Sequence, residues 1–146
     1  MGKITIGRNE YKVEECTMFQ QEILFWTENP RVYSVLRENG NDNPSQSEIE
    51  ALMKTTENVK ELKVQIEQNG GLIEPLTVVR RGDDYVAIEG NSRLAAYRIL
   101  AEGNPTKWSK LPVNVLPETI TDTELFIYVG TIHLVKKKDW TVFEQA

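Results

Sequence analysis

The pattern of hydrophobic and polar positions divides the chain into short β-rich stretches and longer stretches of helical spacing. The β-rich stretches, each of which predicts a strand or an extended arm, are residues 3–7, 11–18, 76–80, 85–88 and 111–116. The third and fourth flank a turn with Gly82 and two aspartates, and together they predict a β-hairpin. Pro112 and Pro117 bracket the last stretch and favour a sheet edge or a strand end.

Three stretches predict helices, namely residues 48–69, residues 93–102 and a stretch that opens at residue 121. The first starts at a capping box of Ser47 and Glu50 and ends at Gly70. The sequence of residues 54–56 is compatible with a break in this helix. The apolar face of this first helix contains Val59, Leu62 and Ile66. The third begins at a capping box of Thr121 and Glu124. Its apolar residues are Leu125, Phe126, Val129 and Ile132.

Length and composition restrict the classes of protein that the chain can be. Its 146 residues fit one domain, and 17 basic against 22 acidic residues give a net charge of −5. No stretch has the apolar length of a membrane helix or of a secretion signal, so we expect a cytoplasmic protein with no membrane partner. One cysteine and one histidine exclude a disulfide within the chain and a zinc site of the Cys/His type. The acidic balance means that DNA binding would need a local basic patch or another domain.

A candidate phosphate site lies where the predicted hairpin meets the helix of residues 93–102. Gly90, Asn91 and Ser92 form a strand-to-helix turn in which a glycine lets the backbone approach a ligand closely. The free amides at a helix N-terminus bind anions, and Arg93 adds a cation there. The same pattern also occurs in turns that bind nothing, so the residues alone leave both interpretations open.

The order of the segments resembles the N-terminal domain of ParB-like proteins, in the ParB/sulfiredoxin superfamily. The resemblance rests on an Asn-Pro-Arg segment ending at Arg31, a Gly-x-x-x-Pro segment from Gly71 to Pro75, the hairpin, and the Gly90 to Arg93 box. It implies an α+β fold in which a small mixed sheet is packed by several helices. It covers residues 29–146, so we expect residues 1–28 to be an N-terminal extension or extra strands.

The resemblance also implies a function and a set of site residues. ParB-like domains bind a nucleotide, CTP with Mg²⁺ in the partition proteins. Carried over by position, the phosphate- or nucleotide-binding residues are Arg31, Gly71, Pro75, Gly90, Asn91, Ser92, Arg93 and Thr131. Glu89 and His133 are the candidates for acid–base catalysis, and no metal ligand is assigned. Asn91, Ser92 and Ala95 stand where the family's box has charged residues, so the box retains only one of its arginines.

The leading hypothesis is a nucleotide- or phosphate-binding domain that acts in DNA partition, in plasmid or phage maintenance, or in regulation. A capping box of Thr141 and Glu144 at the end of the sequence predicts a longer protein, with a DNA-binding domain beyond residue 146. A homodimer is compatible with this interpretation. There are two alternatives. One is a stand-alone enzyme of the superfamily, such as a nuclease, a nucleotide triphosphatase or a small-molecule phosphotransferase. The other is a degenerate domain that is kept for protein interaction.

Overall fold

The computed structural model describes residues 2–28, 40, 44–72 and 74–132. Arg31, His133 and the capping box at Thr141 therefore lie outside the described residues. Among the helices that the structure describes, none combines the length and apolar composition needed to cross a bilayer.

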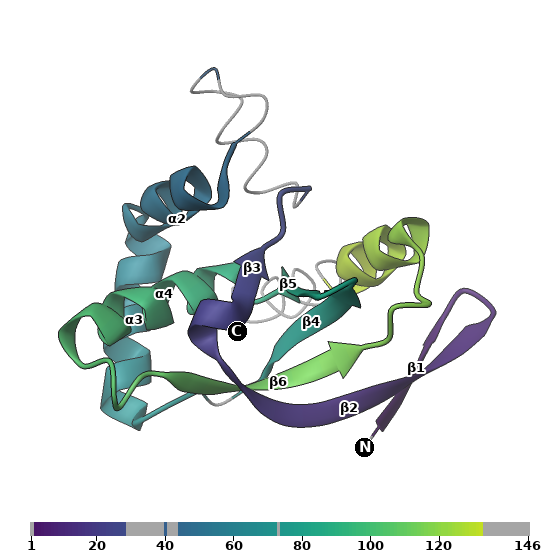
Figure 1. The fold of residues 1–146 in the computed structure, drawn as a ribbon, viewed down its shortest axis with the longest axis horizontal. Coiled ribbons are helices and arrows are strands. Elements are labelled where there is room, and N and C mark those ends of the chain that lie inside the picture. Colours follow the sequence, from purple (N-terminus) through teal and green to yellow (C-terminus); the bar gives the residue numbers. More distant parts are fainter. Residues whose placement is uncertain (1, 29–39, 41–43, 73, 133–146) are drawn as a thin grey trace, which may run out of the picture.

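A six-stranded mixed sheet forms the centre of the fold, with the strand order β1-β2-β6-β4-β5-β3 (Figure 1). The strands are β1 (Gly2–Ile6), β2 (Asn9–Phe19), β3 (Ile23–Phe25), β4 (Leu76–Arg81), β5 (Asp84–Glu89) and β6 (Lys110–Leu116). The pairs β3–β5 and β4–β6 are parallel, and the other three pairs are antiparallel. The predicted hairpin is confirmed as β4–β5, and both predicted N-terminal strands are present as β1 and β2 of this same sheet.

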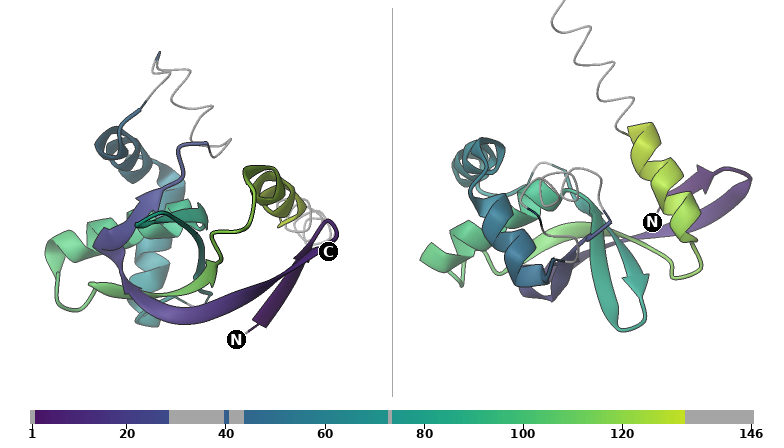
Figure 2. Two further views of the ribbon diagram at one scale, coloured as in Figure 1. Left: turned by 45° about the vertical axis from the view of Figure 1, so that its right-hand side comes forward. Right: turned by 90° about the horizontal axis from the view of Figure 1, so that it is seen from above.

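The helices form two separate groups around the sheet. These helices are α2 (Gln46–Lys54), α3 (Glu57–Asn69), α4 (Asn91–Gly103) and a helix over residues 122–132, and a short 3-10 turn (Gln20–Glu22) links β2 to β3. Figure 2 shows α2, α3 and α4 gathered on one side, with the helix of residues 122–132 on the other. The α+β fold with a small mixed sheet and several helices is therefore confirmed.

Each face of the sheet is covered by its own hydrophobic cluster. Successive residues of a strand point to opposite faces, so Val78 belongs to the cluster under α3 and α4, whereas Val79 belongs to the cluster under residues 122–132. Leu94 and Leu100 of α4 pack in the first cluster. Leu125 packs in the second, so both faces of β4 are buried.

The start of α2 differs from the sequence prediction by two residues. The sequence Ser45-Gln46-Ser47-Glu48-Ile49-Glu50 contains two overlapping capping boxes, and the structure uses Ser45 with Glu48 rather than Ser47 with Glu50. The earlier start makes Gln46 the first helical residue. Its side-chain amide then exchanges two hydrogen bonds of 2.8 Å with the backbone of Phe25 on β3. The expected break is confirmed, because α2 ends at Lys54 and Thr56 caps α3.

Strand β6 lies inside the sheet, so of the two positions that its prolines favour, the sheet edge is wrong, and the strand end is confirmed for Pro117. It pairs with β2 on one side and with β4 on the other. Pro112 lies opposite Thr17 of β2, and the pairing with β4 begins only at the next residue, where Val113 lies opposite Leu76. The N–H that proline lacks is therefore not needed for the pairing with β4. Pro117 follows directly after the last strand residue.

The helix of residues 122–132 is fastened at its N-terminus to the β1–β2 hairpin. Its capping box is confirmed: Glu124 N–H donates to Thr121 Oγ1, and the Glu124 carboxylate accepts from Thr121 N–H at 3.0 Å. The same carboxylate accepts from Tyr11 Oη and from Asn9 Nδ2, the latter at 3.1 Å. The hydrogen bond from Tyr11, followed by those from Thr121 and Asn9, lowers the pKa of Glu124 to about 2.

We expect this carboxylate to make the fold acid-sensitive. A folded-state pKa below the ordinary 4.5 adds stability above that pH, and this stability is lost as the pH falls from about 4.5 towards 2. We therefore expect the native chain to have a higher melting temperature than Glu124→Gln. The difference should be largest at pH 7 and become smaller below pH 5, as measured by thermal unfolding followed by circular dichroism. Glu67→Gln, on the exposed side of α3, is the control. A constant difference at all pH values would contradict this role of the charge.

Candidate functional site

The turn between β5 and α4 has a backbone that only glycine adopts easily. Gly90 has φ 96° and ψ 23°, in the left-handed region. A Cβ atom at this position would lie 2.3 Å from Cδ2 of Leu76 and 3.0 Å from Nη2 of Arg93. Gly90 is therefore fixed both by its conformation and by the close approach of two side chains.

The first turn of α4 leaves backbone donors without partners inside the helix. Leu94 makes the first helical hydrogen bond, to the carbonyl of Gly90 at 2.9 Å, so the amides of Asn91, Ser92 and Arg93 precede the helical ladder. No side chain caps this end. These amides and the positive end of the helix dipole favour an anion next to the turn.

Arg93 folds back over this turn and joins two segments that are far apart in the sequence. Its Nη1 donates to the carbonyl of Glu74 at 2.8 Å and to that of Pro75 at 3.4 Å. Its Nη2 lies 3.7 Å from Oε1 of Glu89, and both of these side chains are about 15% exposed. A bulge in the β4–β5 pairing places Glu89 opposite Thr77, next to the turn. Glu89 thus acts here as the ion-pair partner of Arg93.

A cavity of about 290 Å³ opens beside this cluster, between α3 and the segment that leads into β4. Its described lining residues are Leu62, Gln65, Ile66, Asn69, Gly71, Leu72, Glu74 and Arg93. Two residues of the predicted site, Gly71 and Arg93, meet here although they are 22 positions apart in the chain. Burial raises the pKa of Tyr97 on α4, whose hydroxyl group hydrogen-bonds with the backbone of Leu72 in the cavity wall.

The sequence prediction missed the α3 wall of this cavity. The helical spacing of Leu62 and Ile66 predicts an apolar helix face, but it does not indicate that this face lines a cavity. The carboxamides of Gln65 and Asn69, one helical turn apart, were the available signal, because they lie immediately before the Gly71 segment.

The side chain of Asn91 is buried and holds two backbone groups. Its Oδ1 accepts from Trp26 N–H at 3.1 Å, and its Nδ2 donates to the carbonyl of Ala87 at 2.8 Å. The Trp26 ring in turn lies 5.2 Å from that of Phe126, on the helix of residues 122–132. Because both ends of the Asn91 amide have backbone partners, only its main-chain N–H remains for the predicted phosphate contact.

The remaining predicted site residues are not among the described lining residues of the cavity. The carbonyl of Pro75 accepts from Arg93, and Ser92 Oγ accepts from Nδ2 of Asn58 on α3 at 3.4 Å. Thr131 is on the helix of residues 122–132, and its Oγ1 donates to the carbonyl of Ile127 at 2.8 Å. The functional assignments of these residues, like those of Gly71, Gly90, Asn91 and Arg93 and of the undescribed Arg31 and His133, stay predictions.

A structure of chromosome-partitioning protein ParB has a similar fold. The ParB chain is the C-terminally truncated protein from Caulobacter crescentus, complexed with CTP-gamma-S. The TM-score is 0.53 at 16% sequence identity, and the match covers 84% of this chain and 53% of the ParB chain. Neither a family model nor a curated protein matches the sequence. The ParB-like fold expected from the order of the segments is therefore confirmed, and the chain spans about half the length of that structure.

Proposed function

We propose that the chain is a ParB-like nucleotide-binding domain whose ligand occupies the cavity next to Arg93. The observation that carries the proposal is that the cavity unites Gly71, Glu74 and Arg93, from the two segments that the sequence singles out. The similar ParB structure contains CTP-gamma-S, which supports a nucleotide as the ligand.

The lining of the cavity suits the two parts of a nucleotide. Its apolar residues, Leu62, Ile66 and Leu72, provide a surface for a base or a ribose. At the α4 end, Arg93 supplies a guanidinium group, and the first-turn amides of the helix lie in the same segment. In this proposal Glu89 orients the Arg93 side chain rather than taking a proton from the substrate, because it is already paired with that arginine.

The proposed cellular role follows the ParB likeness. We place the domain, comprising residues 29–146, in DNA partition, plasmid or phage maintenance, or regulation. DNA would be contacted through a domain outside this chain, and a homodimer is part of the same proposal. The likeness to a chromosome-partitioning protein supports this context.

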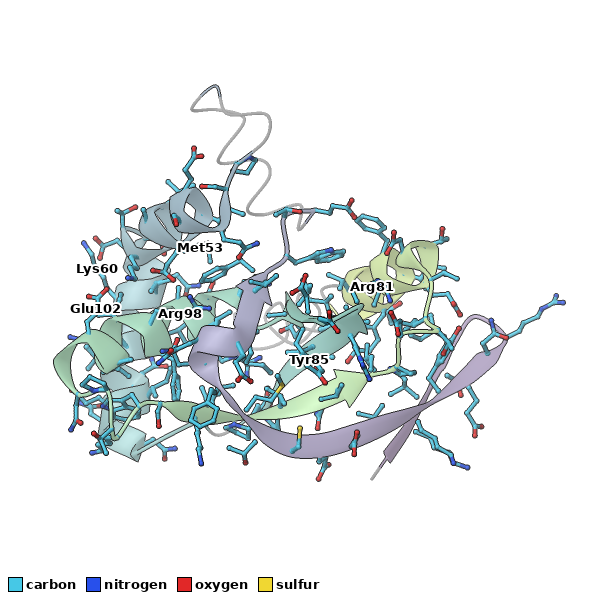
Figure 3. All side chains as sticks on the ribbon, in the orientation of Figure 1. Met53, Lys60, Arg81, Tyr85, Arg98 and Glu102 are labelled. Atoms are coloured by element: carbon cyan, nitrogen blue, oxygen red, sulfur yellow. The ribbon has the colours of Figure 1, made fainter. Side chains whose placement is uncertain are left out.

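Calorimetric titration of the domain with CTP, ATP, ADP and GTP, each with and without Mg²⁺, tests the proposal. We expect saturable binding, weakened about tenfold to a hundredfold in Arg93→Ala, because a hydrogen-bonded charge is removed from the phosphate. Arg98→Ala is the matched control (Figure 3). Arg98, like Arg93, is a part-buried arginine of α4, and it donates hydrogen bonds to the carboxylate of Glu50 and to the backbone carbonyl of Ile23. It is not among the described lining residues of the cavity.

The two variants separate a ligand contact from a purely structural role. Both should lower the melting temperature, and only Arg93→Ala should weaken binding at a temperature where both are folded. Equal affinity in the native chain and Arg93→Ala would contradict the site, as would equal weakening in both variants. No binding of any nucleotide by the native chain would refute the proposed function.

A further inference from the structure

The described donor groups of the cavity do not fit a nucleoside triphosphate with Mg²⁺, the ligand that the fold implies. Arg93 is the single cation among the described lining residues, and Glu89 already pairs with it. Glu74 adds a carboxylate at the rim, so the formal charges of the lining cancel. In the described part of the chain, no group of three or more His, Cys, Asp or Glu side chains is placed to hold a metal ion.

Two helix termini of opposite polarity contribute residues to the cavity. Helix α3 ends at the cavity, where Gly70 is its C-cap and Asn69 and Gly71 are lining residues. A helix C-terminus carries a partial negative charge, and the N-terminus of α4 carries a partial positive charge. One anionic group is therefore favoured next to Arg93, and further negative charge extending towards α3 is opposed.

The α3 end of the cavity offers hydrogen-bond acceptors rather than cations. Asn69 Nδ2 donates to the carbonyl of Gly71 at 2.9 Å, so its Oδ1 is the atom of the amide directed away from that bond. Gln65 adds a second carboxamide one turn earlier. The apolar side chains of Leu62, Ile66 and Leu72 complete this end. A flat, apolar ring that carries an amino group matches such a surface.

We propose that the ligand of this cavity is a nucleoside monophosphate with an amino-bearing base, and not a magnesium nucleoside triphosphate. The phosphate lies next to Arg93 and the base lies against α3. A phosphate monoester carries a charge of about −1.5 to −2 at pH 7 and places it next to Arg93 and the N-terminus of α4. A triphosphate adds further negative charge to a lining whose own formal charges cancel. This inference rests on the proposed nucleotide-binding function and specifies its substrate class.

Calorimetric titration with the series CMP, CDP, CTP and AMP, ADP, ATP, with and without Mg²⁺, tests the inference. We expect each monophosphate to bind the native chain at least tenfold more tightly than the triphosphate of the same base. Triphosphates binding more tightly than monophosphates would overturn the inference and leave the proposed function standing. If no member of the series binds, both the inference and the proposed function are wrong.

A charge reversal at the rim tests the electrostatic reason separately. Glu74→Lys replaces the rim carboxylate, which is exposed, and leaves the backbone carbonyl of residue 74 available to Arg93. We expect this variant to bind CTP and ATP about tenfold more tightly than the native chain at low salt, with a smaller gain for CMP and AMP. Glu67→Lys makes the same charge change on the exposed side of α3 away from the cavity and should have little effect. An equal gain for monophosphates and triphosphates in Glu74→Lys would overturn the argument from charge.

Discussion

Replacing Gly90 by alanine is expected to lower the free energy of unfolding by about 2–5 kcal/mol, a large fraction of the stability of a domain of this size. A residue with a Cβ pays about 1–2 kcal/mol in the left-handed region that Gly90 occupies. The new methyl group would also lie 2.3 Å from Cδ2 of Leu76, which is fully buried. Forcing extra volume into a packed core costs a further 1–3 kcal/mol or so. Denaturant unfolding measures the sum.

Gly103→Ala is the matched control for this prediction. Gly103 is the last residue of the same helix, and its φ is not positive. Apart from its chain neighbours and its own helix backbone, no atom of the described residues lies within 4 Å of the Cβ that alanine would add. Because alanine favours the helix over glycine, this variant should be as stable as the native chain or more stable by up to about 1 kcal/mol. A similar loss in both variants would contradict the strain and close contact assigned to Gly90.

The parts of the fold that local sequence determines were predictable. A β-hairpin depends on two β-rich runs and a turn, and the β4–β5 turn has Gly82 in the left-handed region that such turns require. The end of α3 depends on Gly70, which takes the left-handed conformation with φ 82°. The glycine turn before α4 was recognised for the same reason. The ParB-like order of these segments then identified the fold.

The parts that depend on distant contacts were not predictable in the same way. Two capping boxes overlap at the start of α2, and the choice of Ser45 is accompanied by the contact of Gln46 with Phe25, 21 positions earlier in the chain. Pro112 lies inside the sheet, and its position is compatible with the fold because the pairing of β6 with β4 begins one residue later, at Val113. The cavity likewise has walls from α3 and α4 that only the folded chain brings together.

The local chemistry of the predicted site was also changed by tertiary contacts. Asn91 fitted a phosphate-binding turn by position, but its side chain binds the backbone of Trp26, which is 65 positions away in the sequence. Glu89 is a candidate for an acid–base role by its place beside Gly90, and the fold adds an ion pair with Arg93 that the sequence does not indicate. A short sequence motif specifies which groups are near each other along the chain, and it does not specify which of them already have partners.

The link between Asn91 and Trp26 leads to the second large effect, a loss of about 2–6 kcal/mol in the free energy of unfolding of Asn91→Ala. Alanine is well suited to the first turn of a helix, so α4 itself is not weakened. The loss comes from the Trp26 N–H and the Ala87 carbonyl, two buried backbone groups that would each lose a partner at a cost of about 1–3 kcal/mol. Denaturant unfolding of the native chain and the variant measures this loss.

Gln46→Ala is the control for Asn91→Ala, because Gln46, like Asn91, makes two side-chain hydrogen bonds to the backbone, in its case both to Phe25 of strand β3. Those bonds are only partly buried, so water can replace them, and the expected loss is about 1 kcal/mol. The two variants should also differ in where the chain loosens. Since the Trp26 ring packs against Phe126, hydrogen exchange in the helix of residues 122–132 should accelerate more in Asn91→Ala than in Gln46→Ala at matched global stability. Equal exchange in that helix would mean that the α4 turn and the helix are not coupled through Trp26. If Asn91→Ala loses no more unfolding free energy than Gln46→Ala, burial adds nothing to the hydrogen bonds of Asn91.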